Sequence, residues 1–431
     1  MYSFFQFLPM TVLASMLFGA GYILITLEHR FNMHKAVTAT ALGAALWILI
    51  GFMEGHGAEV ALEEIGSEIF GLVVFLLAAM TLVEILIHYR FFDLVYMRLQ
   101  ALRLTDVHQL WLIGILAFFL SAVIDNLTTT IVMLQIARRF FRGKNLLVAA
   151  AGIVIAANAG GAFSPIGDVT TIMLWLAGKF TAPEVLAWGF MPAVILFGVS
   201  MWFLMQKLDR DTADVSEENP ENFSLLRSER IVITATFVSF TFPVIAHFFG
   251  LPPYIGLLFG IGLVGSLVTF FSKIRTHQSH LSLDVEKILK RTDLASILFF
   301  IGILLAVGAL KHLHVLSFIS HAVFGSNPSF WGYVVGNSFL GVFSAIVDNI
   351  PLTAAAIDIV HSSDPAIWVL LALAVGTGGS MLVIGSAAGV VAMGIVKELT
   401  FKRYLEIASL PAFIGYGAAI AVWYLQYQLF R

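Results

Sequence analysis

Two stretches of this chain read almost alike, and each places an aspartate–asparagine pair within an apolar segment. They are Phe119-Leu120-Ser121-Ala122-Val123-Ile124-Asp125-Asn126-Leu127-Thr128 and Phe343-Ser344-Ala345-Ile346-Val347-Asp348-Asn349-Ile350-Pro351-Leu352-Thr353. A second apolar segment follows each of them and is interrupted by a glycine doublet. One pair of motifs therefore occurs twice in the same order. Interrupted hydrophobic segments at matching places in two halves of a chain indicate the binding site of a secondary transporter.

The composition is that of an integral membrane protein. Of 431 residues, 59% are hydrophobic and 12% are charged, whereas roughly 25% are charged in soluble domains. Apolar runs of about 20 residues, the length that crosses a bilayer as a helix, recur from end to end. Lipid offers the backbone no hydrogen-bonding partners, so these runs must be helical. We expect an all-α membrane protein covered by lipid, with no nucleic-acid partner, and the absence of cysteine excludes disulfides and thiolate metal sites.

Ten apolar segments have the length of full spans: 7–27, 34–53, 68–88, 146–178, 183–205, 231–249, 254–271, 293–312, 366–397 and 404–427. The longest two, 146–178 and 366–397, contain the glycine doublets. We expect each to be two half-helices joined by an unwound stretch at Gly160 and Gly161, and at Gly378 and Gly379. Two further segments, about 107–141 and 331–360, hold the aspartate–asparagine pairs. They could be spans with polar centres, or hairpins that enter and leave the membrane on one side.

The distribution of lysine and arginine favours the hairpins. If both segments are re-entrant, 21 of the 24 lysines and arginines fall on one side of the membrane, and Lys179, Lys311 and Arg431 fall on the other. The positive-inside rule makes the basic side cytoplasmic. A crossing at 107–141 would place its two basic flanks on opposite sides. This topology predicts that both termini and the acidic residues Glu54, Glu59, Glu63 and Glu64 lie outside.

The two halves of the chain then have the same plan. Residues 1–205 and 231–431 each contain five spans and one hairpin, and a polar cytoplasmic linker at 206–230 joins them. An odd number of spans turns the second copy upside down. We therefore predict two inverted-topology repeats of five spans each, with one re-entrant hairpin and one broken helix per repeat. The two hairpin tips would meet near the middle of the membrane.

Carboxylates at membrane depth are the candidates for coupling. An ionised carboxylate is costly in hydrocarbon, so it is expected to be functional or paired. Asp125, Asp168 and Asp348 qualify by position, and Glu84 near the inner end of the third span is a fourth candidate, although it could reach the interface beside Arg90. No basic residue lies at a comparable depth in these motifs. The carboxylates could then be neutralised by protonation, by coordination of a cation, or by both in alternation. A carboxylate that alternates between a proton and a cation is the minimal unit of a cation/proton antiporter.

The motifs also supply neutral oxygen atoms, which hard cations prefer as ligands. Each of these side chains could instead serve a hydrogen bond between helices, and the glycines could instead permit close packing. We expect Na⁺ at Asp125, Asn126, Asn158, Asp348 and Asn349, with no resident cofactor. The full set of candidate ligands is Asn126, Thr128, Asn158, Ser164, Thr170 and Thr171 in the first half, and Asn349, Thr353, Thr377, Ser380 and Ser386 in the second.

The chain resembles the NhaD-type sodium/proton antiporters of the ion transporter superfamily over essentially its whole length. The resemblance rests on Asp125-Asn126, on Asp348-Asn349-Ile350-Pro351, and on the run from Asn158 to Thr171. It implies exchange of Na⁺, and often Li⁺, for H⁺ in a bacterial inner membrane, a homodimer, and an elevator-like movement of a transport domain against a scaffold. One departure is that Ser386 stands where the first repeat has Asp168. Whether one cation or two bind is therefore left open.

The predicted function is secondary transport that exports Na⁺ or Li⁺ in exchange for H⁺, without enzymatic activity. An arsenite or metalloid permease of the same superfamily is the alternative, and a dicarboxylate carrier is disfavoured by the negative charge of the site. A channel would need a continuous polar pore, whereas polarity here is confined to the two motif pairs. An intramembrane metalloprotease would need a His-Glu-x-x-His helix, which the sequence lacks.

Overall fold

The computed structural model describes residues 2–26, 34–55, 57–209, 225–274, 291–325 and 328–430. All regular secondary structure in these ranges is helical. Eight helical segments are long and apolar enough to cross a membrane, and shorter apolar helices lie between them. The chain is therefore a multi-pass membrane protein, as predicted. Residues 210–224 of the predicted linker lie outside the described ranges, as do several residues on which the predicted topology depends: Arg30, Arg210, Arg275, Lys287, Lys290 and Arg431.

The helices form two compact units, each built from both halves of the sequence. The small unit comprises Met1–Leu77, Thr292–Gly336 and Ile350–Ser362. The large unit comprises Ala78–Arg291, Asn337–Asn349 and Ser363–Arg431. The candidate residues in both motif pairs belong to the large unit, except for Thr353.

The small unit is organised by the packing of α3 (Lys35–Glu54) against α15 (Leu294–His312). A Cβ atom on Gly43 would lie 2.5 Å from the carbonyl oxygen of Gly302, so the two backbones touch. Small residues permit such close approach between membrane helices. The Trp47 indole donates a hydrogen bond to the Leu305 carbonyl at 2.8 Å across the same contact. The unit also contains α1 (Tyr2–Thr26), which packs on α3, and α16 (Val315–Phe324).

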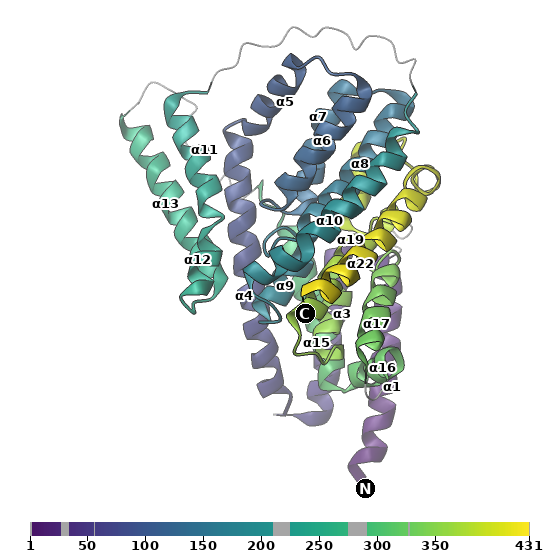
Figure 1. Cartoon of the computed structure of the whole chain (residues 1–431). Coiled ribbons are helices and arrows are strands. Elements are labelled where there is room, and N and C mark those ends of the chain that lie inside the picture. Colours follow the sequence, from purple (N-terminus) through teal and green to yellow (C-terminus); the bar gives the residue numbers. More distant parts are fainter. Residues whose placement is uncertain are drawn as a thin grey trace. The chain divides into compact units, whose positions relative to one another are not determined.

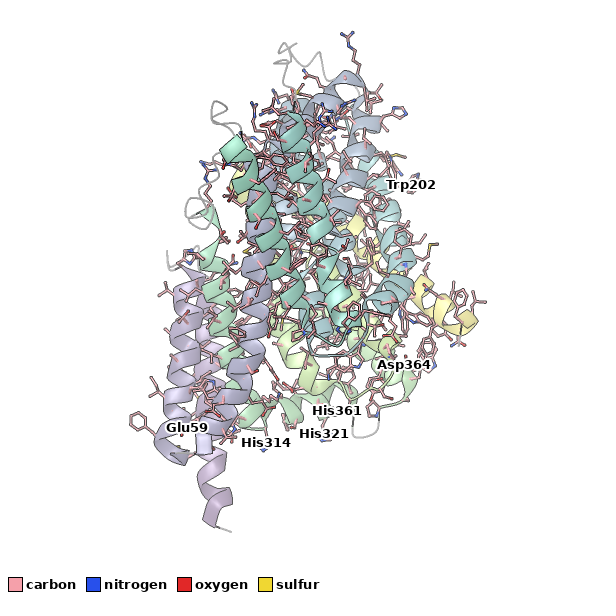
Figure 2. The ribbon with its side chains drawn as sticks, turned by 90° about the vertical axis from the view of Figure 1, so that its left-hand side faces the viewer. Glu59, Trp202, His314, His321, His361 and Asp364 are labelled. Atoms are coloured by element: carbon pink, nitrogen blue, oxygen red, sulfur yellow. The ribbon has the colours of Figure 1, made fainter. Side chains whose placement is uncertain are left out.

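Charged side chains at the ends of these helices are paired. Lys311 Nζ lies 3.2 Å from Asp358 and 3.8 Å from Glu68, and His312 Nε2 lies 2.6 Å from Glu54. His314, which precedes α16, adopts a left-handed backbone conformation at φ 57°. Figure 2 labels both histidines of this short helix: His314 directly precedes it and His321 lies in its last turn.

The large unit surrounds two helices that are buried on all sides, α8 (Gly143–Ala162) and α19 (Pro365–Gly378). Every residue from 147 to 162 and every residue from 366 to 378 is buried. Helices that are apolar around their whole circumference belong to the interior. They are enclosed by α6 (Asp106–Ser121), α10 (Ala182–Met205) and α22 (Leu410–Phe430), and Figure 1 shows α10 and α22 side by side.

Each aspartate–asparagine pair lies at a turn between two short helices. Residues 122–125 connect α6 to α7 (Asn126–Phe140), and residues 344–348 connect α17 (Phe330–Phe343) to α18 (Asn349–Ile359). Both long glycine-containing segments are broken, as predicted. Residues 163–168 separate α8 from α9 (Val169–Leu176), and residues 379–386 separate α19 from α20 (Ala387–Ile395), with a 3-10 turn at Val383–Gly385.

The predicted position of the breaks was wrong for three of the four glycines, and only Gly379 lies in an unwound stretch. Gly160, Gly161 and Gly378 are helical, and Gly379 directly follows the last turn of α19. A Cβ atom on Gly160 would overlap the carbonyl group of Phe118, and one on Gly378 would overlap that of Gly341. The first glycine of each doublet therefore lets α8 or α19 press against the helix that precedes the turn, whereas the second faces its own helix break, Gly161 at Gly167 and Gly379 at Gly385. The first break falls instead around Pro165, which has no N–H to continue the helix.

The remaining helix boundaries also differ in places from the prediction. The third span begins earlier, at α4 (Gly57–His88), since the acidic residues before it lie in a run of good helix formers. The span at 231–249 is interrupted, because Pro243 ends the hydrogen-bond ladder between α11 (Arg227–Ser239) and α12 (Phe242–Phe248). The last span begins with α21 (Phe401–Tyr404) and the π-helix η3 (Leu405–Ser409). The large unit also contains α5 (Phe91–Ala101) and α13 (Pro253–Ile274).

The close contact at Gly160 gives a test of this packing. Gly160→Ala is expected to lower the free energy of unfolding by about 3 kcal/mol, because the added methyl group meets a backbone carbonyl that cannot rotate away. Gly198→Ala is the matched control, since α10 offers open space there and alanine favours a helix by up to about 1 kcal/mol. Thermal unfolding of both variants in detergent measures the difference. Equal melting temperatures would contradict the close packing of α8 on α6.

Candidate functional site

The carboxylate of Asp168 receives hydrogen bonds from both aspartate–asparagine motifs. Asp168 begins α9 directly after the first helix break and is 1% exposed. The Asn126 side-chain amide donates to Oδ1 at 3.3 Å, and the Asn349 amide donates to Oδ2 at 3.3 Å. Asn126 and Asn349 are the first residues of α7 and α18, so both turns place the N-terminal residue of a helix beside the same carboxylate. Two segments far apart in the sequence thus meet at Asp168.

Asn158 connects this carboxylate to the second broken helix. It lies in the last turns of α8 and is completely buried. Its side-chain oxygen accepts a hydrogen bond from Asn126 at 3.0 Å, while its amide donates to Ser380 Oγ at 2.8 Å and to Ser386 Oγ at 3.1 Å. We call the residues joined by these bonds the buried polar cluster: Asn126, Asn158, Asp168, Asn349, Ser380 and Ser386.

The buried polar cluster contains one carboxylate, that of Asp168. None of the ion pairs formed by the described residues includes Asp168. Asp348 lies close enough to Asp168 for the two carboxylates to repel each other when both are ionised. Burying a carboxylate without a cationic partner is costly. A proton or a bound cation would remove that cost, and the amide and hydroxyl oxygens of the cluster are suitable ligands for a hard cation.

Asp125 and Thr128 are bound to each other rather than to the cluster. The Asp125 carboxylate accepts from the Thr128 amide at 2.8 Å and from the Thr128 hydroxyl at 2.7 Å, as an N-cap of α7 does. Asp125 is half-buried. The structure therefore gives Asp125 a capping role at the turn and does not join it to Asp168 by a hydrogen bond.

The other predicted ligands have mixed surroundings. Ser164 Oγ donates to the Ala122 carbonyl at 2.5 Å and so ties the first break to the first turn. The Thr170 side chain is buried beside the Asp168 carboxylate, and the Thr171 hydroxyl donates to the Asp168 carbonyl at 2.8 Å. The Thr377 hydroxyl bonds back to its own helix, at Leu373. Thr353 is buried in α18, in the small unit.

Glu84 forms an ion pair away from the cluster. Its carboxylate lies 3.6 Å from Arg291 Nη1, and its side chain is 13% exposed. Arg90, beside which Glu84 could have reached the interface, pairs with Asp93 at 2.8 Å. Arg291 is distant from Glu84 in the sequence, so the local sequence did not indicate this pair.

Three hydroxyl groups around the cluster were not predicted. Ser121 Oγ donates to the Ala157 carbonyl at 2.6 Å, and Ser344 Oγ donates to the Val375 carbonyl at 2.8 Å. Both serines lie within the repeated motif, so the repetition itself could have identified them. The third is Tyr404, whose hydroxyl donates to the Ser380 carbonyl at 2.8 Å. No motif or spacing distinguishes Tyr404 from the other aromatic residues of the last span.

Known proteins that are similar to this chain align with nearly its whole length. The citrate-transporter family CitMHS matches residues 22–378. Sodium/proton antiporter 1 of Arabidopsis thaliana is 35% identical to the chain, with 97% of the chain and 73% of the relative aligned. The Na⁺/H⁺ antiporter NhaD of Alkalimonas amylolytica is 32% identical, with 94% and 88% aligned. The Na⁺/H⁺ antiporter NhaD of Vibrio parahaemolyticus is also 32% identical, with 90% and 99% aligned.

Proposed function

The chain belongs to the NhaD-type sodium/proton antiporters within the citrate-transporter family, and on this premise we propose that it exchanges Na⁺, and also Li⁺, for H⁺. The family consists of transporters, so no enzymatic activity is assigned. The proposal rests mainly on the buried carboxylate of Asp168. Side-chain amides from both aspartate–asparagine motifs donate hydrogen bonds to it, and no basic side chain among the described residues forms an ion pair with it. Such a group is suited to hold a proton or a cation in turn.

In the proposed mechanism, H⁺ and Na⁺ compete for the carboxylates of Asp168 and Asp348. When Asp168 is protonated, the charge in the cluster is removed and the site crosses the membrane neutralised. When it is ionised, Na⁺ replaces the proton, and the side chains of Asn126 and Asn349, whose N–H groups donate to the carboxylate in the structure, rotate so that their oxygens face the ion. The oxygens of Asn158, Ser380 and Ser386 complete the ligands. Asp125 supports this site by capping α7 and is a further candidate for holding a proton.

The proposed architecture has two inverted-topology repeats, residues 1–205 and 231–431. The re-entrant hairpins would be α6–α7 and α17–α18, and the broken helices would be α8–α9 and α19–α20. Matching contacts support this assignment: Ser121 with Ala157 and Gly160 with Phe118 in one half, and Ser344 with Val375 and Gly378 with Gly341 in the other. Each hairpin thus packs on its broken helix in the same way.

We place the protein in a bacterial inner membrane, with the main basic loops in the cytoplasm and both termini outside. Its proposed assembly is a homodimer, and its proposed motion is an elevator-like displacement of the hairpins and broken helices. A carrier of citrate or another carboxylate is less favoured, although the matching family is named for citrate. The carboxylates of Asp168 and Asp348 would repel an anion, and no arginine or lysine among the described residues pairs with Asp168.

Reconstitution tests the proposed function directly. We expect Na⁺ or Li⁺ pulses to move protons in liposomes that contain the protein and an internal pH dye, and K⁺ pulses to have a smaller effect. Arsenite and citrate are applied in parallel as alternative substrates. Protein-free liposomes control for leakage. Uptake of arsenite or citrate without any response to the alkali cations would overturn the antiporter and favour another member of the superfamily.

The competition between H⁺ and Na⁺ predicts the direction of the pH dependence. A carboxylate must lose its proton before it can bind a cation, so acidification weakens Na⁺ binding. For one competing proton, each unit of decrease in pH raises the apparent KM for Na⁺ by about tenfold in the range where the site titrates. The measurement is the KM for Na⁺ at a series of pH values. A KM that does not change with pH would exclude competition at a shared carboxylate.

A further inference from the structure

Tyr404 is a completely buried tyrosine whose hydroxyl group reaches the second helix break. It donates to the Ser380 carbonyl at 2.8 Å. The Ser380 hydroxyl in turn receives the Asn158 amide at 2.8 Å. Ser380 is therefore fixed from two sides, with its backbone bound to Tyr404 and its side chain bound to Asn158. Hydrogen bonds continue from Asn158 to Asn126 and from Asn126 to Asp168, so Tyr404 stands at one end of a chain that reaches the carboxylate.

The Ser380 carbonyl needs such a partner because of where it lies. Ser380 lies beyond α19 and its C-cap Gly379, in the helix break, so its carbonyl has no place in a helical hydrogen-bond ladder and needs another donor. The backbone turn at this point is held by the Ser380 amide bonded to the Thr377 carbonyl at 2.9 Å. Ser380 is 1% exposed, and a buried carbonyl left without a donor is unfavourable. The Tyr404 hydroxyl removes that penalty and fixes the direction of the turn.

The first helix break is held differently, which explains why the second one needs Tyr404. In the first break, the Ser164 hydroxyl bonds to the Ala122 carbonyl at 2.5 Å and accepts from the Ile166 amide at 3.4 Å. When Asp168 is aligned with Ser386, the residue that matches Ser164 is Leu382, which has no hydroxyl group. The second break therefore lacks the internal anchor of the first. Tyr404 supplies an anchor from a different helix.

Tyr404 is itself held in place at an unusual helix. It ends α21 and is followed by the π-helix η3. Lys207, just beyond the end of α10, donates to the carbonyls of Glu406 and Ile407 in this π-helix, both at 2.8 Å. π-helical turns are rare and are frequently found at functional sites. The π-helix and Lys207 fix the segment from which the Tyr404 ring reaches inward.

We propose that Tyr404 is a positioning residue of the cation site and that it acts through Ser380 and Asn158. The inference rests on the proposed function. Tyr404 does not touch the ion, so its hydroxyl affects how firmly the ligands are preorganised rather than how fast the loaded site moves. Removal of the hydroxyl is expected to raise the KM for Na⁺ about fivefold, the effect of one neutral hydrogen bond on affinity, with little change in the maximal rate.

Tyr404→Phe tests the proposal, and Tyr416→Phe is its matched control. Tyr416 is also a buried tyrosine of the last span, 4% exposed, and donates to a backbone carbonyl, that of Ser338 at 2.7 Å, which lies in α17 and not in the break. Both variants lose one comparable hydrogen bond and should unfold at similar temperatures. In proteoliposomes, the KM for Na⁺ should rise about fivefold in Tyr404→Phe and remain unchanged in Tyr416→Phe.

The outcomes separate this proposal from the proposed function. A wild-type protein without Na⁺-dependent proton movement overturns both. An active wild type with an unchanged KM in Tyr404→Phe, or with the same rise in both variants, overturns only the role of Tyr404. If Tyr404→Phe is not recovered folded, Lys207→Met replaces it, with Lys144→Met as the control, since Lys144 pairs with Asp209 instead. Lys207→Met should raise the KM about twofold, because it releases the π-helix that directly follows Tyr404, and an unchanged KM overturns the proposal.

Discussion

Asp168→Asn is expected to abolish Na⁺-dependent proton movement while the protein remains folded. The substitution keeps the size and shape of the side chain and removes its charge. The amides of Asn126 and Asn349 lose a charged acceptor, and a cation loses its principal ligand. A hydrogen bond or ligand contact of a charged group contributes up to about 3 kcal/mol, which corresponds to about a 100-fold loss of affinity. The proton that this carboxylate carries is lost as well, so exchange should fall below detection.

The folding of this variant should not suffer in proportion. The wild-type protein buries a carboxylate without a basic partner among the described residues, which is unfavourable in itself. Asparagine has nearly the same shape as aspartate and removes the cost of burying an ionised carboxylate. We therefore expect an unfolding temperature in detergent equal to or above that of the wild type. Loss of exchange in a fully stable protein separates a coupling role of Asp168 from a structural one.

Asp209→Asn is the matched control for Asp168→Asn. Asp209 follows α10, its side chain is 53% exposed, and its carboxylate pairs with Lys144 at 2.7 Å, so the same chemical change is made outside the buried polar cluster. Exchange measured with an internal pH dye should remain at the wild-type level in this control. Exchange at that level in Asp168→Asn would place the coupling elsewhere, with Asp125 and Asp348 as the groups to test next.

The candidate site was accessible from the sequence because each of its polar residues interrupts an apolar segment. A carboxylate or an asparagine in such a segment stands out against its neighbours, and the repetition of the motif pairs Asn126 with Asn349. The structure brings both of these residues to Asp168, and it joins Asn158 to Ser380 and Ser386. Length and hydrophobicity likewise located most of the helices, since a membrane imposes both quantities directly on a span.

The errors and omissions concern contacts between segments that are far apart in the sequence. Gly160 was assigned to an unwound stretch, but the approach of Phe118 in α6 explains why glycine is needed within a regular helix. Glu84 pairs with Arg291, although Arg90 is much nearer along the chain. The sequence did not indicate a role for Tyr404, because tyrosine is common in apolar spans and the carbonyl that accepts its hydrogen bond, that of Ser380, lies in another segment. Local patterns predict what a residue is suited to do but not which partner the packing brings to it.

The two half-sites are unequal at the start of the second half-helix. Asp168 begins α9, and Ser386 begins α20, where its hydroxyl accepts from the Gly389 amide at 3.2 Å. The same hydroxyl also accepts from Asn158, so the second half contributes a neutral oxygen where the first contributes a charge. Asn158 is therefore the residue through which the charged half is joined to the neutral half. Its removal should affect both halves together.

Asn158→Ala is expected to lower Na⁺ exchange by about 100-fold at subsaturating Na⁺. The substitution removes three hydrogen bonds at once, and each neutral hydrogen bond contributes about 1 kcal/mol. Asn126 loses one of its two acceptors, and Ser380 and Ser386 lose their link to the first half. The same change is expected to lower the free energy of unfolding by about 3 kcal/mol, because a completely buried amide is replaced by a smaller group.

Asn145→Ala separates the loss of stability from the loss of transport. Asn145 lies near the start of the same helix and is also completely buried. Its side chain makes three comparable hydrogen bonds: to the Asp106 carboxylate at 2.7 Å, to the Asp209 carbonyl at 3.0 Å, and from the Asp209 amide at 2.8 Å. Both variants should therefore unfold at similarly reduced temperatures. When exchange is compared at equal amounts of folded protein, Asn145→Ala should resemble the wild type and Asn158→Ala should not. If both variants lose transport equally, the bonds of Asn158 hold the fold rather than the ion, and Asp168 would have to bind the cation without the second half of the cluster.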